Sequence, residues 1–85
     1  MSYPTSIYCH TFSPTGGSIN VKQLAVEAPV GTTIDFYQSS NDSNPTRIVI
    51  GENETYEITN FSMHHAVVGP TASTKALFTY EKGED

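Results

Sequence analysis

Apolar and polar residues alternate along short stretches of this chain, and turn-forming residues separate one stretch from the next. In residues 32–38, for example, Ile34 and Phe36 share one face of an extended chain, while Thr, Asp and Tyr side chains occupy the other. A period of two is typical of a half-buried β-strand, and no stretch keeps the helical spacing of apolar residues over three turns. The pattern therefore predicts an all-β domain without a substantial helix.

The residue types in these stretches support the same prediction. The chain holds 11 Thr, 6 Val and 6 Ile but only two Leu, and branching at Cβ suits a pleated strand better than a helix. Charged residues make up 15% of the chain, whereas about 25% is usual in soluble domains, and 20 Ser and Thr side chains keep the surface polar. A polar surface with so little charge favours association with other proteins.

Seven strands are expected at intervals of about 8 to 12 residues, which is typical of a small antiparallel β-sandwich with a jelly-roll-like or immunoglobulin-like topology. In the second strand, Ile19 and Val21 lie on one phase and Leu24 and Val26 on the opposite phase, which predicts a bulge near Lys22-Gln23. The fourth and fifth strands are expected to form a hairpin, and the sixth to be covered on both faces. The seven stretches are residues 5–12, 18–28, 32–38, 46–50, 55–60, 61–68 and 72–81.

The length and charge of the chain limit its function. One domain is expected over residues 1–85, with residues 1–4 and 82–85 flexible. A chain this short buries only about 60–65% of its unfolded surface, which leaves no room for a deep interdomain cleft and argues against a large catalytic apparatus. A net charge of −5 with only four basic side chains argues against nucleic-acid and membrane partners. The single Cys9 cannot form an internal disulfide, and neither a signal peptide nor a membrane span is expected.

Two short runs place potential metal ligands next to each other. Cys9 and His10 lie in the first stretch, and His64 and His65 lie in the sixth. Zinc needs three or four converging ligands, but adjacent residues of a strand point to opposite faces, so each run offers one ligand to a given face. A site would need a residue from each run and a further carboxylate. We therefore expect partly buried or interface histidines, with no metal, no cofactor and no catalytic residue.

Aromatic side chains on the first and last stretches indicate a contact surface with other proteins. The alternative function is ligand binding, carbohydrate first, at Ser39–Pro45, a run of turn-forming residues that is expected to be the longest exposed loop. A third hypothesis is a small acidic inhibitor of a host enzyme. The candidate contact residues are Tyr8, His10, Phe12, Leu77, Phe78 and Tyr80, and the candidate residues at the loop are Tyr37, Asn41, Asp42 and Asn44.

Two segments of the C-terminal half carry a resemblance: residues 46–58, TRIVIGENETYEI, and residues 74–81, TKALFTYE. In the general character of these two segments, the chain resembles the small virion structural proteins of tailed bacteriophages, which decorate capsids or build neck and tail parts. The resemblance implies a β unit without cofactor or enzymatic activity that forms a homo-oligomer or joins a larger viral protein assembly. It also implies that the protein is made in the bacterial cytoplasm and is located in the virion.

Overall fold

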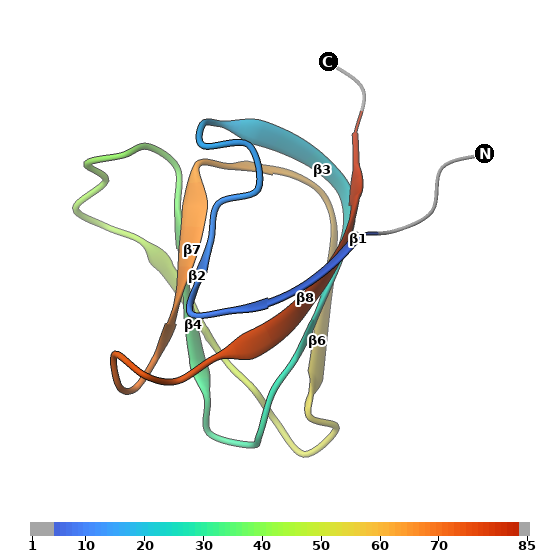
Figure 1. The fold of residues 1–85 in the computed structure, drawn as a ribbon, viewed down its shortest axis with the longest axis vertical. Helices are drawn as coiled ribbons and strands as arrows, with labels where there is room; N and C mark the ends of the chain where they lie inside the picture. Colours follow the sequence, from blue (N-terminus) through green and yellow to red (C-terminus); the bar gives the residue numbers. More distant parts are fainter. Residues whose placement is uncertain (1–4, 84–85) are drawn as a thin grey trace.

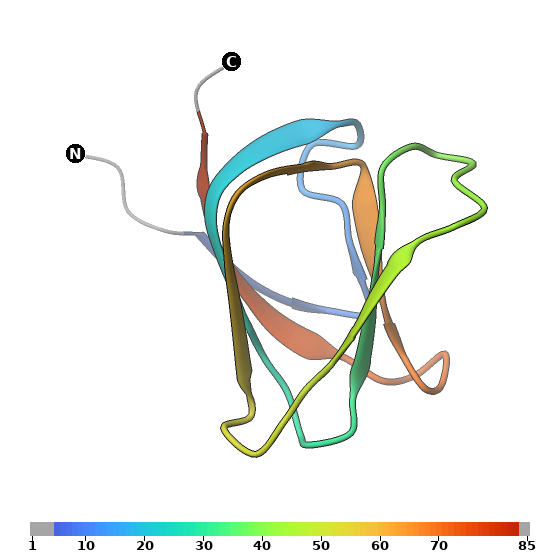
Figure 2. The same ribbon diagram turned by 180° about the vertical axis from the view of Figure 1, so that it is seen from behind.

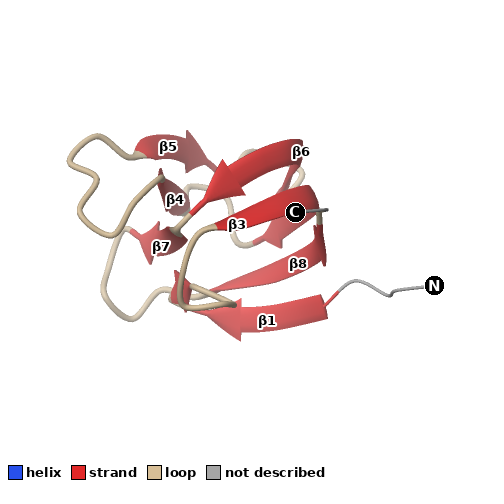
Figure 3. Cartoon of the chain, turned by 90° about the horizontal axis from the view of Figure 1, so that it is seen from above, coloured by secondary structure: helices blue, strands red, loops and turns tan. Residues whose placement is uncertain are grey.

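The computed structural model describes residues 5–83, which form eight β-strands in two sheets of four (Figure 3). All paired strands are antiparallel, and residues 5–83 contain no helix, so the all-β sandwich predicted from the alternation is confirmed. It follows that this range has no helix long and apolar enough to cross a membrane. The strands are β1 (Thr5–Cys9), β2 (Thr11–Phe12), β3 (Ile19–Glu27), β4 (Thr33–Tyr37), β5 (Thr46–Val49), β6 (Thr55–Met63), β7 (His65–Gly69) and β8 (Ala76–Lys82).

The strand order identifies which of the two expected topologies the chain adopts. One sheet has the order β1-β8-β3-β6 and the other the order β2-β7-β4-β5. One long hairpin, folded between β4 and β5, would contain the pairs β1·β8, β2·β7, β3·β6 and β4·β5. When this hairpin rolls up into two sheets, it gains the pairs β3·β8 and β4·β7 (Figures 1 and 2). Every connection except β4 to β5 passes from one sheet to the other. This arrangement is a jelly roll of eight strands.

The hydrophobic core lies between the sheets and is bridged by aromatic pairs. Phe12 of β2 stacks on Phe78 of β8, with ring centroids 4.5 Å apart, and it meets Tyr80 edge to face, with ring centroids 5.1 Å apart. Phe36 of β4 and Phe61 of β6 meet edge to face at 5.8 Å. Each of these contacts joins a strand of one sheet to a strand of the other. Burying one such side chain stabilises the fold by about 1.5–3 kcal/mol, so the rings hold the two sheets together.

The predicted bulge in the second stretch is confirmed. The register between β3 and β8 shifts between Val21 and Gln23, and the buried side of β3 changes phase there. β6 changes phase at the same level, where Asn60 adopts a left-handed backbone conformation with φ 54°. Asn tolerates this conformation better than most residues. Both nine-residue strands therefore bend together and curve around the end of the sandwich (Figure 1).

Two predicted strands are each divided between the two sheets. The strand predicted over residues 5–12 is wrong, because β1 ends at Cys9 and β2 begins at Thr11 in the other sheet. The strand predicted over residues 61–68 is also wrong, because the chain passes from β6 to β7 at His64. Apolar side chains on both phases suggested strands covered on both faces. They reflect instead a change of phase at each corner, which keeps the apolar side chains of both halves in the same core.

The hairpin predicted from residues 46–50 and 55–60 is wrong as well. β5 pairs with β4 and β6 pairs with β3, so the turn between them crosses from one sheet to the other. Backbone hydrogen bonds to the neighbouring β3–β4 connection hold it: Gly31 N donates to Ile50 O at 2.9 Å, and Ala28 N donates to Glu54 O at 3.0 Å. A short turn can join two strands of one hairpin or connect the two sheets. Here the hydrogen bonds to the β3–β4 connection favour the connection between sheets.

Two residues of the C-terminal segment that was predicted to be flexible, Lys82 and Gly83, are among the described residues. Lys82 is the last residue of β8, and Gly83 N donates a hydrogen bond of 2.8 Å to Asn20 O of β3. The remainder of the two predicted segments, residues 1–4 and 84–85, lies outside the described residues.

We predict that Gly69→Ala destabilises the fold by about 1–3 kcal/mol, the usual cost of overpacking. Gly69 lies opposite Thr33, and a Cβ at Gly69 would come within 2.6 Å of Thr33 Oγ1. Gly51→Ala is the matched control, because nothing lies within 4 Å of a Cβ there. The free energy of unfolding in urea measures both variants, and equal values for the two would contradict the prediction.

Candidate functional site

Two histidines meet the end of β4 beside the predicted binding loop. Tyr37, the last residue of β4, pairs with His65, the first residue of β7, and the two rings stack with centroids 4.4 Å apart and planes 5° apart. The backbone N–H of His64 donates to Tyr37 O at 2.7 Å. The β6–β7 corner is thereby fixed against the strand from which the loop begins. Tyr37 was predicted to lie beside the loop, but no pattern in the sequence indicates that His64 and His65 lie there too.

The two histidines also bond to each other. Their Nδ1 atoms lie 2.9 Å apart and their rings meet edge to face. Such a bond needs an N–H on one ring and a lone pair on the other, so the accepting imidazole is neutral. Burial lowers the pKa of His65 below its ordinary value, the neighbouring His64 lowers this pKa further, and the Asp42 carboxylate partly opposes both effects. Burial and the neighbouring His64 therefore favour the neutral form of His65 in the folded chain.

The loop between β4 and β5 is the longest connection between the described strands, as predicted, and Asp42 organises it. The Asp42 carboxylate accepts hydrogen bonds from the backbone N–H of Gln38 at 3.0 Å and of Asn44 at 2.9 Å. These two bonds lower the pKa of Asp42, the one from Gln38 most. Asn41 and Asn44 are exposed at the surface of this loop. The four predicted loop residues thus lie in one region, with Asp42 serving the loop itself.

The potential metal ligands do not converge. His10 lies near the end of β7, where its carbonyl accepts from Val68 N, whereas His65 begins that strand. The Nδ1 atom of His10 is hydrogen-bonded to Thr74 O at 2.8 Å, and burial raises the pKa of the Cys9 thiol. Within residues 5–83, no three His, Cys, Asp or Glu side chains are grouped so as to hold a metal ion.

The predicted contact residues divide between the surface and the core. Phe12 and Phe78 have no exposed area, so the structure removes both from any contact surface. The change of phase at His10 turns Phe12 inward, and Phe78 lies on the inward-facing phase of β8. Tyr8 is 66% exposed and lies opposite Leu77 of β8, with the Lys75 ammonium 6.0 Å from the centre of its ring. His10, Leu77 and Tyr80 are half-buried.

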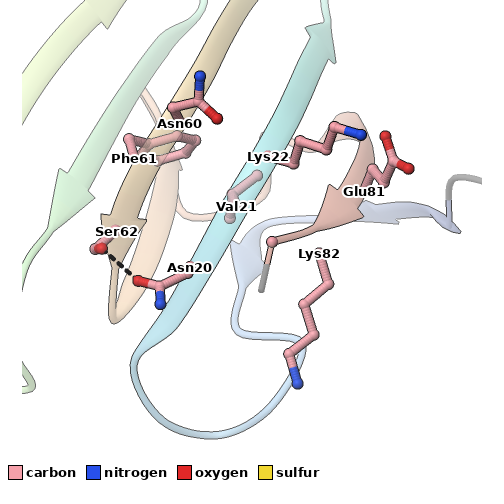
Figure 4. Close-up of a pocket in the computed structure, with 9 residues that line it drawn as sticks. Asn20, Val21, Lys22, Asn60, Phe61, Ser62, Glu81 and Lys82 are labelled. Carbon is pink, nitrogen blue, oxygen red and sulfur yellow. Dashed lines mark hydrogen bonds between the residues drawn. The ribbon is translucent and has the colours of Figure 1, made fainter. Parts of the chain in front are cut away.

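A cleft of about 640 Å³ lies where β3, β6 and β8 bend together (Figure 4). The bulge in β3 and the left-handed residue in β6 open it, and the sequence signalled it only through the predicted bulge. Ser62 Oγ donates to Asn20 Oδ1 at 2.6 Å across the two strands. Lys22 and Glu81 extend to one side of the cleft and Lys82 extends to another. The cleft is lined by Asn20, Val21, Lys22, Asn60, Phe61, Ser62, Glu81, Lys82 and Gly83.

We predict that the free energy of unfolding falls as the pH is lowered from about 7.5 to about 5, in part because of His65. The pKa of His65 is lower in the folded chain than the ordinary value of 6.5, so the unfolded chain takes up the proton first. The contribution of His65 to the free energy of unfolding is therefore present above pH 6.5, and it is lost as the pH falls from 6.5 through the lower pKa of the folded chain. His65→Gln should flatten this dependence of the unfolding free energy on pH, measured by urea unfolding. Identical profiles for the wild type and His65→Gln would contradict this assignment.

Comparison with known proteins provides no family for this chain. No protein-family description, no curated protein and no solved structure matches it.

Proposed function

We propose that this protein is a non-enzymatic structural module that works by assembling with other protein chains. The observation that carries the proposal is that both sheets are open, so that β1, β6, β2 and β5 are edge strands. Edge strands present unpaired backbone N–H and C=O groups, which another chain can satisfy by adding a strand. Assembly would cover these edges and enlarge a thin core. Tyr8, Val30 and Val49 are large apolar side chains that remain exposed and would gain most from being covered.

The more specific form of the proposal is a component of a bacteriophage virion, acting in capsid decoration or as a head or tail part. Two observations support it: the resemblance in residues 46–58 and 74–81, and the jelly roll, an architecture that viral capsid proteins use. The support from the fold is an analogy, because one architecture hosts many functions. The proposed partners are copies of this chain and other proteins of the particle.

We predict that the protein self-associates at micromolar concentration and does so more strongly at higher salt. Each chain carries a net charge of −5, and salt screens the repulsion between copies without weakening backbone pairing or apolar contacts. Light scattering after size-exclusion chromatography should give a mass above the 9.3 kDa of one chain, rising between about 50 and 500 mM NaCl. A mass of one chain at every salt concentration would count against an assembly role.

Carbohydrate binding is a second candidate function, and the cleft favours it. Its volume falls within the range of about 300–1,000 Å³ that small-molecule sites occupy. The Asn60 amide and the Glu81 carboxylate can exchange hydrogen bonds with hydroxyl groups, and Phe61 supplies an apolar surface. Lys22 and Lys82 give the cleft a positive balance over Glu81 in an otherwise acidic chain. A carboxylated sugar combines the hydroxyl groups and the negative charge that these side chains would bind.

We predict that, if this second function holds, Lys22→Gln weakens the binding of a hexuronate oligosaccharide by about tenfold, the cost of one charge-assisted hydrogen bond. Lys75→Gln is the matched control, because Lys75 is an exposed lysine that lies over Tyr8, outside the cleft. Isothermal titration calorimetry measures both variants. The second candidate would be abandoned if the wild type bound no uronate, or if both variants bound it equally well.

A further inference from the structure

β1 is the least protected edge of the two sheets. Its five residues, Thr5 to Cys9, include no charged residue and no proline, the usual devices that prevent strand addition. Among residues 5–83, no strand lies beyond it in its sheet (Figure 3). Tyr8 is the most exposed large hydrophobic side chain within residues 5–83, and the inward-facing Ile7 and Cys9 are only half-buried. The strand is thus both open along its backbone and incompletely covered on its inner face.

The other three edges are protected in ways that β1 is not. β2 has only two residues, which offers little backbone for pairing. β5 carries the exposed Arg47, whose guanidinium is fixed to Asp35 by bonds of 2.8 and 3.0 Å. β6 carries the exposed Glu57 and is interrupted by the left-handed conformation of Asn60. Charge, shortness and irregular backbone all oppose strand addition, so β1 is the edge most suited to accept a partner.

We propose that β1 pairs antiparallel with β1 of a second copy across a two-fold axis at Ile7, forming one continuous sheet of eight strands. This inference rests on the proposed assembly function and names the partner and the surface. An antiparallel strand pair is self-complementary, as a two-fold contact requires, and a centre at the middle residue is the register that pairs all five residues. Strand β1 carries no charged side chain, so no like charges would face each other along the pair of strands.

The side chains agree with this register. Ile7 would face Ile7 of the second copy on the inner side of the sheet, which would complete the burial of a side chain that is now half-exposed. On the outer side, Ser6 would face Tyr8 of the second copy. Tyr8 already lies opposite Leu77, so its ring would lie between Leu77 of its own copy and Ser6 of the second copy. A shift of one residue would place inner side chains of one copy opposite outer side chains of the other. A shift of two residues would keep the faces matched but would leave end residues unpaired.

The test is a disulfide between position 5 of one copy and Cys9 of the other, which this register places directly opposite each other on the same side of the sheet. Under mild oxidation Thr5→Cys should form a disulfide dimer, seen as a doubled mass on a non-reducing gel, and peptide mapping should show that the bond joins positions 5 and 9. Within one chain the two cysteines would be about 13 Å apart along the strand, too far to bond. The wild type, with Cys9 alone, and Val49→Cys on the edge strand β5 are the controls, and neither should cross-link.

A second variant tests the pairing without a disulfide. Ser6→Lys places a charge on the β1 edge and should raise the dissociation constant of the dimer at least tenfold in sedimentation equilibrium, whereas Thr59→Lys, an exposed position on β6, should not. Circular dichroism confirms that both variants fold. If the wild type associates but Thr5→Cys fails to cross-link, the β1 contact is wrong and the assembly function stands. If the wild type is a monomer throughout, both fail.

Discussion

Contact between aromatic rings of opposite sheets is the interaction on which the rest of this structure depends. A sandwich of this size has one thin core, and the stack of Phe12 on Phe78 joins the short strand β2 to the long strand β8. β2 has only two residues, so its ladder of hydrogen bonds alone would hold it weakly. The burial of Phe12 fixes the strand in place, and this requires the chain to change phase at His10.

Changes of phase recur wherever the chain bends, and they create the chemically distinctive regions of the surface. The bulge in β3 and the left-handed Asn60 in β6 bend the sheet and open the cleft. The corner at His64 places two imidazoles in hydrogen-bonding contact beside Tyr37. Elsewhere the strands keep a period of two, and their outer positions include hydroxyl-bearing side chains such as Ser6, Thr59 and Thr79. In this fold the departures from a period of two mark the candidate sites.

The jelly roll leaves a second feature, the open edges. Rolling one hairpin into two sheets cannot close either sheet, so each retains two edge strands. The chain has few charged side chains with which to protect them, and Arg47 on β5 is held by Asp35. The scarcity of charge that distinguishes the composition thus has a structural consequence, since at least β1 lacks the charges that commonly prevent association.

The alternation of side chains, with the many β-branched residues, determined that the chain is all-β, that Ile34 and Phe36 face the core and that β3 is bulged near Lys22-Gln23. The run of turn-forming residues over 39–45 determined that the longest loop precedes β5. Alternation specifies which side of a strand is buried, but it does not specify which strand lies beside it. Backbone hydrogen bonds are nearly independent of side-chain identity, so the assignment of β5 and β6 to different sheets was decided by tertiary contacts. The stacking of Tyr37 on His65 and the cleft at the common bend depend on that pairing, which brings together residues far apart in the chain, and only the tertiary structure could decide them.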